Sequence, residues 1–134
     1  MDLRERTKIA SGGPYEDLVG YSRVLATGLF VYVAGTTASS DGSPIPATVE
    51  AQTAQTMEII KSKLAQVSCA IDEIVRVRMF VVDIKKDWEA ISQVMNRYFK
   101  EIKPVMTMVE VKGLIDDDMR IEIEVDAVRK ASPA

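Results

Sequence analysis

Hydrophobic and polar side chains alternate along the C-terminal part of the chain, between residues 105 and 128. A period of two residues is the signature of a strand with one buried face. Gly113 and the three aspartates at 116–118 interrupt the alternation, and both residue types favour turns. We therefore expect two antiparallel strands joined by a short acidic loop, with Glu110 and Glu122 near the same face.

Three further strands are expected upstream of this pair. Residues 29–34 form an almost continuous apolar run, which is typical of a strand buried on both faces. The run follows a shorter candidate strand at residues 21–25, and Thr27-Gly28 between them favours a hairpin. Residues 74–82 alternate again, and their second face is partly apolar. This pattern indicates a central strand.

Two segments have the apolar spacing of helices, three or four residues apart. The first follows Thr48, a good N-cap residue, and is expected to end near Ser68. The second is expected from Trp88 to about Ile102, with Asp87 as its cap. Residues 14–17 are expected to form a loop.

The order of these elements indicates an α/β domain with two layers, a mixed sheet and two helices on one face. Two helices cover only one face of such a sheet, yet several of the strands carry apolar residues on both faces. Uncovered apolar sheet surface usually marks an interface. The pattern therefore predicts a homo-oligomer.

The composition narrows the classes of function. The 134 residues fit one domain, 1–134, and they include one cysteine, Cys69, and no histidine. A lone cysteine excludes an internal disulfide and suits a reducing compartment. The absence of histidine removes the commonest general base and metal ligand. The net charge of −3 argues against nucleic-acid binding, and no apolar run reaches the roughly 20 residues of a membrane span. With no signal segment at the N-terminus, we expect a cytoplasmic protein.

An ordered set of short motifs resembles the RidA family, also called the YjgF or L-PSP family. The resemblance runs from about Gly13 to Arg129, and the motifs that carry it are Gly13–Tyr15, Val31–Thr36, Val77–Asp83, Pro104–Val111 and Ile121–Ala127. It implies a chorismate-mutase-like fold and a homotrimer with a small-molecule pocket between subunits. It also implies hydrolysis of enamines and imines, such as 2-aminoacrylate, without a metal or organic cofactor.

The resemblance also suggests which residues form the pocket. Glu122 stands where the family has a glutamate that positions or activates water. Met106 stands where the family has an arginine that holds the substrate carboxylate, and a thioether cannot replace that bidentate contact. The other positions implied for ligand binding are Tyr15, Gly35, Thr36 and Met108, and Ser92 stands where some members have asparagine.

Several alternatives are open from the sequence. Glu122 also reads as one of several solvent-facing strand charges, and the two methionines as packing residues. An imine hydrolase could take its cation from Arg78 or Arg120, although strand arginines usually face solvent or pair with acids. A label of endoribonuclease or translation inhibitor in the family suggests an RNA-acting protein. Cys69 is expected to be a buried structural thiol, and the aspartates at 116–118 lack the spacing of a calcium loop.

Overall fold

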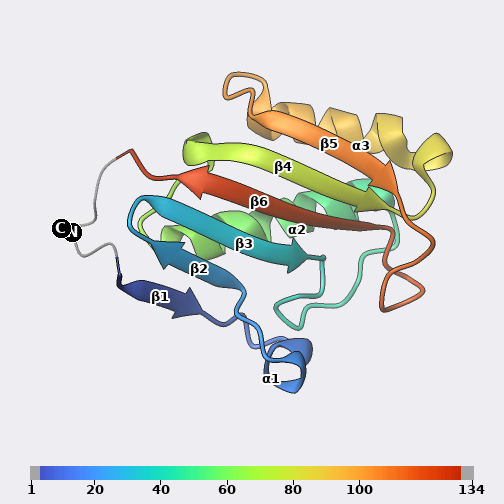
Figure 1. Ribbon diagram of the computed structural model, residues 1–134. Helices are drawn as coiled ribbons and strands as arrows, with labels where there is room; N and C mark the ends of the chain where they lie inside the picture. Colours follow the sequence, from blue (N-terminus) through green and yellow to red (C-terminus); the bar gives the residue numbers. More distant parts are fainter. Residues whose placement is uncertain (1–3, 131–134) are drawn as a thin grey trace.

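The computed structural model describes residues 4–130, which form one mixed sheet and two long helices (Figure 1). The sheet order is β1-β2-β3-β6-β4-β5, and only β4 and β5 pair in parallel. The elements in chain order are β1 (Arg6–Ile9), α1 (Tyr15–Val19), β2 (Val24–Thr27), β3 (Phe30–Thr36), α2 (Val49–Ala65), the 3-10 turn η1 (Ile71–Glu73), β4 (Ile74–Val81), α3 (Ile84–Phe99), β5 (Val105–Glu110) and β6 (Ile121–Val128).

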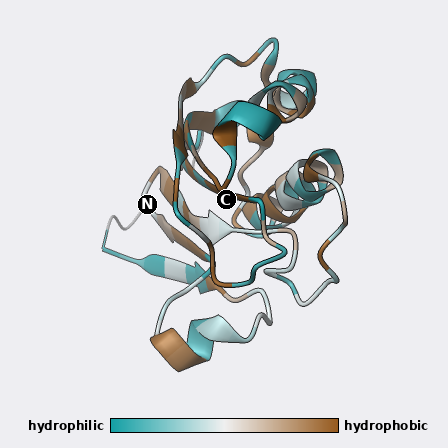
Figure 2. Ribbon diagram, turned by 90° about the vertical axis from the view of Figure 1, so that its right-hand side faces the viewer, coloured by the Kyte–Doolittle hydropathy of each residue, from teal (hydrophilic) through white to brown (hydrophobic). Residues whose placement is uncertain are grey.

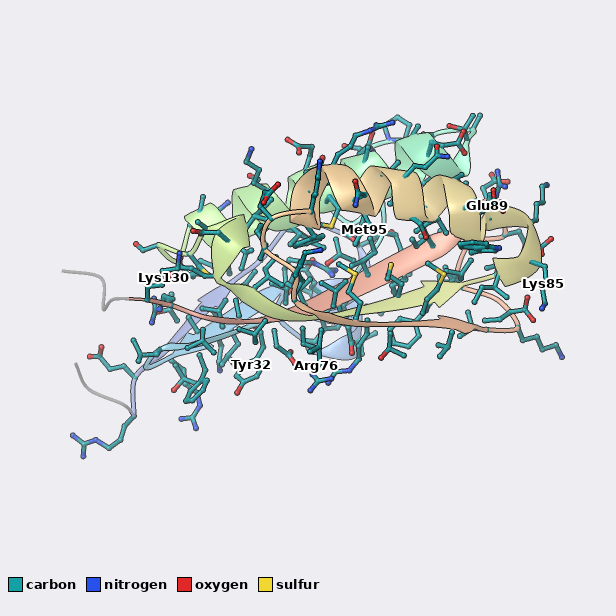
Figure 3. All side chains as sticks on the ribbon, turned by 90° about the horizontal axis from the view of Figure 1, so that it is seen from above. Tyr32, Arg76, Lys85, Glu89, Met95 and Lys130 are labelled. Atoms are coloured by element: carbon teal, nitrogen blue, oxygen red, sulfur yellow. The ribbon has the colours of Figure 1, made fainter. Side chains whose placement is uncertain are left out.

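Both long helices cover the same face of the sheet, which confirms the expected two-layer α/β architecture (Figure 2). The hydrophobic core lies between the helices and the sheet. It consists of alternate residues of β2, β3, β6 and β4 and one stripe of each helix. Ile123 and Val125 of β6 are fully buried there, as is Leu64 of α2. The other face of the sheet, which we call the open face, carries Tyr32 and Arg76, and Figure 3 shows both side chains pointing away from the helices.

Residues 29–34, which the sequence predicts to be buried on both faces of the sheet, are exposed on the open face. Phe30 and Tyr32 are 53% and 46% exposed, because no element of the described chain covers them. Burial on both faces is therefore wrong for a single chain. The uncovered apolar side chains agree with the pattern from which an oligomer was inferred.

The expected pairing of the last two strands is wrong. β6 lies between β3 and β4, so β4 separates it from β5. The connection through α3 places β5 parallel to β4 at the sheet edge, and the ten residues 111–120 carry the chain back across β4. Glu110 and Glu122 consequently lie on opposite faces, and Glu110 accepts a hydrogen bond from the Ile84 N–H at the start of α3.

Two local expectations also need correction. Residues 14–17 were expected to form a loop, but the backbone of Pro14 is already helical and α1 follows it until Gly20, whose φ is +98°. The second long helix begins one turn earlier than expected, because Asp83 rather than Asp87 caps it. The first long helix does begin as expected, since the Thr48 hydroxyl accepts from the Ala51 N–H.

Candidate ligand site

Two hollows of similar size contain the residues that the sequence suggested for a pocket. The first, which we call the Glu122 hollow, has a volume of about 350 Å³ and is bounded by α1, the loops after β3 and the acidic loop before β6. The second, which we call the methionine hollow, has a volume of about 330 Å³ and lies between α3 and β5. Within the described chain they do not merge, because they share no lining residue.

A bulge in β3 positions Glu122 in the first hollow. The register between β3 and β6 shifts between Val33 and Thr36, so the backbone of Gly35 faces the Glu122 side chain. A Cβ on Gly35 would lie 2.8 Å from the Glu122 Cδ atom. Glycine is therefore required for the carboxylate to rest against this backbone, and bulges of this kind often re-aim side chains at functional sites.

Arg23 forms the inner wall of the Glu122 hollow. Its side chain is 3% exposed, and one guanidinium nitrogen, Nη1, donates to the Gly35 carbonyl at 2.5 Å and to the Thr36 hydroxyl at 3.1 Å. The other, Nη2, donates to Glu16 at 3.4 Å and to the Tyr21 hydroxyl at 3.3 Å. The guanidinium thus ties the β3 bulge to α1 and to the segment before β2.

Glu16 is the buried counter-charge of Arg23. Its side chain is 5% exposed, and it accepts hydrogen bonds from both the N–H and the hydroxyl of Ser11. Burial opposes its ionisation, but the hydrogen bonds from Ser11 and the charge of Arg23 outweigh burial and lower the pKa of Glu16. Glu16 is therefore a fixed negative charge at neutral pH.

The pKa of Glu122 is shifted in the opposite direction to that of Glu16, although both side chains line the same hollow. Burial raises its pKa above the ordinary value, Arg23 opposes that rise, and Glu124 on the same strand adds to it. Two carboxylates whose pKa values are pushed apart by their surroundings are a common arrangement in acid–base sites. Of the two carboxylates, Glu122 is therefore the one that takes up a proton more readily.

Hydroxyl groups make up much of the remaining surface of the Glu122 hollow. They belong to Tyr15, Tyr21, Thr37, Ser39, Ser40 and Ser43. Asp116 and Ile115 lie at the side formed by the acidic loop. The wall therefore offers hydrogen-bond donors and acceptors to a small polar ligand.

The methionine hollow has a different lining. Its apolar side chains are Met79, Met95, Phe99, Pro104, Met106 and Met108, and its polar ones are Ser92, Asn96, Lys100 and Lys103. Lys103 has a positive φ of 52°, a conformation that is uncommon for a residue with a Cβ. Thioethers adapt to many shapes, so this wall suits an apolar group.

The structure thus divides the residues that the sequence grouped together. Tyr15, Gly35 and Glu122 line the first hollow, whereas Met106 and Met108 line the second. Thr36 lines neither hollow; its side chain is fully buried and its hydroxyl donates to the Ala34 carbonyl.

Neither arginine considered as a substitute cation lies in a hollow. Arg78 pairs with Glu124 and Asp126 on the open face, and Arg120 forms a two-point ion pair with Asp87 of α3. The cation beside Glu122 is Arg23, which sequence reasoning missed together with Glu16. Seven positions separate these two residues across a helix and a turn, and no sequence period links them.

Two other candidates have ordinary structural roles in the described chain. Cys69 is buried, and burial raises the pKa of its thiol to about 11, so it is a poor nucleophile. In the acidic loop the Asp118 N–H donates to the Asp116 carboxylate, as in a tight turn. Residues 4–130 contain no group of three or more potential metal ligands and no helix long and apolar enough to cross a membrane.

The chain is similar to proteins of one family along almost all of its length. The model of the family described as endoribonuclease L-PSP matches residues 15–129. The crystal structure of Rv2704 from Mycobacterium tuberculosis, a member of the YjgF/YER057c/UK114 family, superposes with a TM-score of 0.85 at 39% identity, covering 92% of this chain and 99% of that one.

Two relatives extend the comparison. Protein SCO2049 of Streptomyces coelicolor is 29% identical over 130 residues, which cover 92% of each chain. The mitochondrial protein MMF1 of Saccharomyces cerevisiae is 30% identical over 111 residues, which cover 82% of this chain and 75% of the relative. Because the family match spans most of the chain and the folds agree, this protein belongs to the RidA family, also called the YjgF or L-PSP family.

Proposed function

We propose that this protein is a RidA-like homotrimer that binds a small molecule between its subunits. The observation that carries the proposal is the division of the expected pocket residues between two hollows of one chain. A cyclic trimer can place the Glu122 hollow of one subunit against the methionine hollow of the next, so that each pair of subunits completes one site. We take residues 1–134 as one domain of this type, acting in the cytoplasm.

The open face supports a subunit interface. Phe30, Tyr32, Val105 and Val109 are exposed on it, and at least two-fifths of each side chain is accessible. Arg78 pairs with its neighbours Glu124 and Asp126 on the same face, so these charges need no partner from another subunit. Packing the open faces together would bury the apolar side chains without leaving those charges unpaired.

We assign Glu122 as the group that acts on the ligand, with Tyr15, Gly35, Met106 and Met108 around it and Thr36 behind it. Glu122 can accept a hydrogen bond or a proton from the ligand or from water. Met106 offers no charge, so the ligand is held differently from the carboxylate-bearing substrates that the family resemblance implied. We propose a ligand that is less acidic than a 2-imino acid and has an apolar part for the methionines. No cofactor is part of the proposal.

A second function is favoured by one observation. Lys100 and Lys103 line the methionine hollow beside Met106, and among the described residues neither ammonium group forms an ion pair. An ammonium group can bind a carboxylate as a point charge, without the bidentate geometry of arginine. The alternative function is therefore hydrolysis of 2-imino acids with a lysine in place of the arginine.

Hydrolysis assays on variants can decide between these functions. The substrates would be 2-aminoacrylate and 2-iminobutyrate, generated in situ, with an arginine-containing relative as the positive control. We expect little turnover by the wild type, a gain of at least tenfold in Met106→Arg, and loss of that gain when Glu122→Gln is added. Sedimentation of the same samples should show a trimer.

Other outcomes would change the proposal. Wild-type turnover equal to that of the relative, abolished by Lys103→Met or Lys100→Met, would establish the alternative function. A monomer in sedimentation would overturn the shared pocket. A trimer in which Met106→Arg gains no activity would show that more than one residue separates this site from an imine hydrolase.

A further inference from the structure

The Glu122 carboxylate is held without hydrogen bonds. No group among the described residues donates one to it, although it lies against the Gly35 backbone and is partly buried. A carboxylate in that position loses much of its hydration and would favour the neutral form. Some other feature must stabilise its charge if Glu122 is to act as an acceptor or base at neutral pH.

Arg23 is placed to supply that stabilisation. It lines the same hollow, it is almost completely buried, and its donors are fixed by Gly35, Thr36, Glu16 and Tyr21. Its Nε atom is buried without a hydrogen-bond partner among the described residues, as is that of Arg129, so all four hydrogen bonds of the Arg23 side chain come from its two terminal nitrogens. Because these contacts prevent the guanidinium from moving, its charge acts on Glu122 at a constant distance through a poorly solvated region.

We propose that Arg23 is a positioning residue, which keeps Glu122 ionised at neutral pH and holds the Gly35 backbone against which the Glu122 carboxylate rests. The two terminal nitrogens of Arg23 are bonded inside the protein and its Nε is buried, so it does not take over the carboxylate-binding task of the arginine that Met106 replaces. Glu16 tunes the effect, because its negative charge offsets part of the field that Arg23 exerts on Glu122.

The other charges around Glu122 act in the opposite direction or are already paired. Glu124 on β6 raises the proton affinity of Glu122, and Arg78 of β4 is engaged with Glu124 and Asp126. Asp116 in the acidic loop adds further negative charge to the same hollow, and Tyr15 and Tyr21 are the phenols that line it. Within the described chain, Arg23 is the one cation among the residues lining the Glu122 hollow.

Titration of Glu122 in variants of the ligand-free protein tests this inference. Carboxyl ¹³C resonances of labelled glutamates would be followed by NMR, and the Glu122 signal would be assigned by its absence in Glu122→Gln. We expect the Glu122 midpoint to rise in Arg23→Met, to fall in Glu16→Gln, and to stay near the wild-type value in Arg23→Lys, which keeps the charge. The opposite signs for the first two variants separate an electrostatic role from a general loss of packing.

The matched control is Arg120→Met, which also breaks an ion pair with a buried carboxylate, that of Asp87. Unlike Arg23 and Glu16, Arg120 does not line the Glu122 hollow, so the Glu122 midpoint should not move in this variant. If Arg23→Met folds poorly, the double variant Glu16→Gln/Arg23→Met removes both buried charges, and its midpoint should lie above that of Glu16→Gln.

An unchanged midpoint in Arg23→Met, or a rise in Glu16→Gln, would overturn the inference. So would an Arg120→Met shift as large as that of Arg23→Met. The inference rests on the proposed function only in taking Glu122 as the acting group. Because the titration needs no ligand and no turnover, its failure and the failure of the hydrolysis assays can be told apart.

Discussion

The two hollows of this protein are similar in size but are built in different ways. The Glu122 hollow depends on a network in which Arg23, Glu16, Ser11 and Gly35 fix one another through hydrogen bonds. The apolar wall of the methionine hollow is formed by four methionines with Phe99 and Pro104, and of these Met79 and Met95 are buried while Met106 is 39% exposed. The first is rigid and polar, and the second is adaptable and apolar.

This difference indicates that the Glu122 hollow supplies the reactive and hydrogen-bonding groups of the proposed site, and that the methionine hollow adapts to the shape of the apolar part of the ligand. Removing one member of a buried polar network leaves its partners unsatisfied, so the loss is larger than one interaction. Removing one apolar side chain from the edge of a hollow enlarges a space that already exists. Three changes test this contrast, in order of decreasing effect.

The largest effect is expected from Arg23→Met. The change leaves the buried Glu16 carboxylate without its counter-charge, and breaking a buried pair on one side typically costs about 3 kcal/mol or more. The free energy of unfolding, measured by urea denaturation, should fall by about that amount. The double variant Glu16→Gln/Arg23→Met should recover at least half of the loss, because no unpaired charge is left. Equal losses in both variants would contradict a paired, buried network.

A smaller effect is expected from Met95→Ala in the methionine hollow. Met95 is 3% exposed, and Figure 3 shows it between α3 and the sheet. Truncating a buried methionine costs about 2 kcal/mol at the lower end of the usual range, and this site already borders an open space. The matched control is Met106→Ala, where the side chain is half-exposed and the loss should be below about 1 kcal/mol. Similar losses for the two methionines would show that the hollow is closed in solution.

The smallest effect is expected in the pH dependence of stability, where Glu16 and Glu122, two carboxylates of one hollow, should differ in sign. The pKa of Glu16 is lowered in the fold, so its contribution to stability is present above the ordinary value of 4.5 and is lost as the pH falls through the folded value. The pKa of Glu122 is raised mainly by burial, so ionising it costs stability as the pH rises above 4.5.

Glu122→Gln should therefore be more stable than the wild type at pH 7, and the gap should close toward pH 4. Glu16→Gln should be less stable at pH 7, and its gap should also narrow on acidification. Denaturant unfolding at pH 4, 5.5 and 7 measures both differences. A Glu122→Gln variant that gains nothing at pH 7 would mean that the Glu122 carboxylate is well solvated.

Periodicity located most of the long elements of this fold. The buried face of β6 and the start of α2 at Thr48 follow directly from side-chain spacing and capping chemistry, because these are local properties. The sequence could not show that β6 inserts beside β4, since an alternating pattern fits any neighbouring strand. For that reason Glu110 and Glu122 were placed together although β4 and the sheet itself separate them.

In the candidate site, too, local properties could be predicted from the sequence and contacts between distant segments could not. The sequence by itself determined that the chain has no histidine and that Glu122 lies on a half-buried strand, and the resemblance predicted that Met106 takes the place of an arginine. These are properties of single positions and of short spacing. Only the tertiary structure decided that the cation beside Glu122 is Arg23 and that the expected pocket residues belong to two hollows. The reason is physical: a buried charge selects its partner by distance in the folded chain, and the β3 bulge that sets this distance depends on the pairing of segments far apart in sequence.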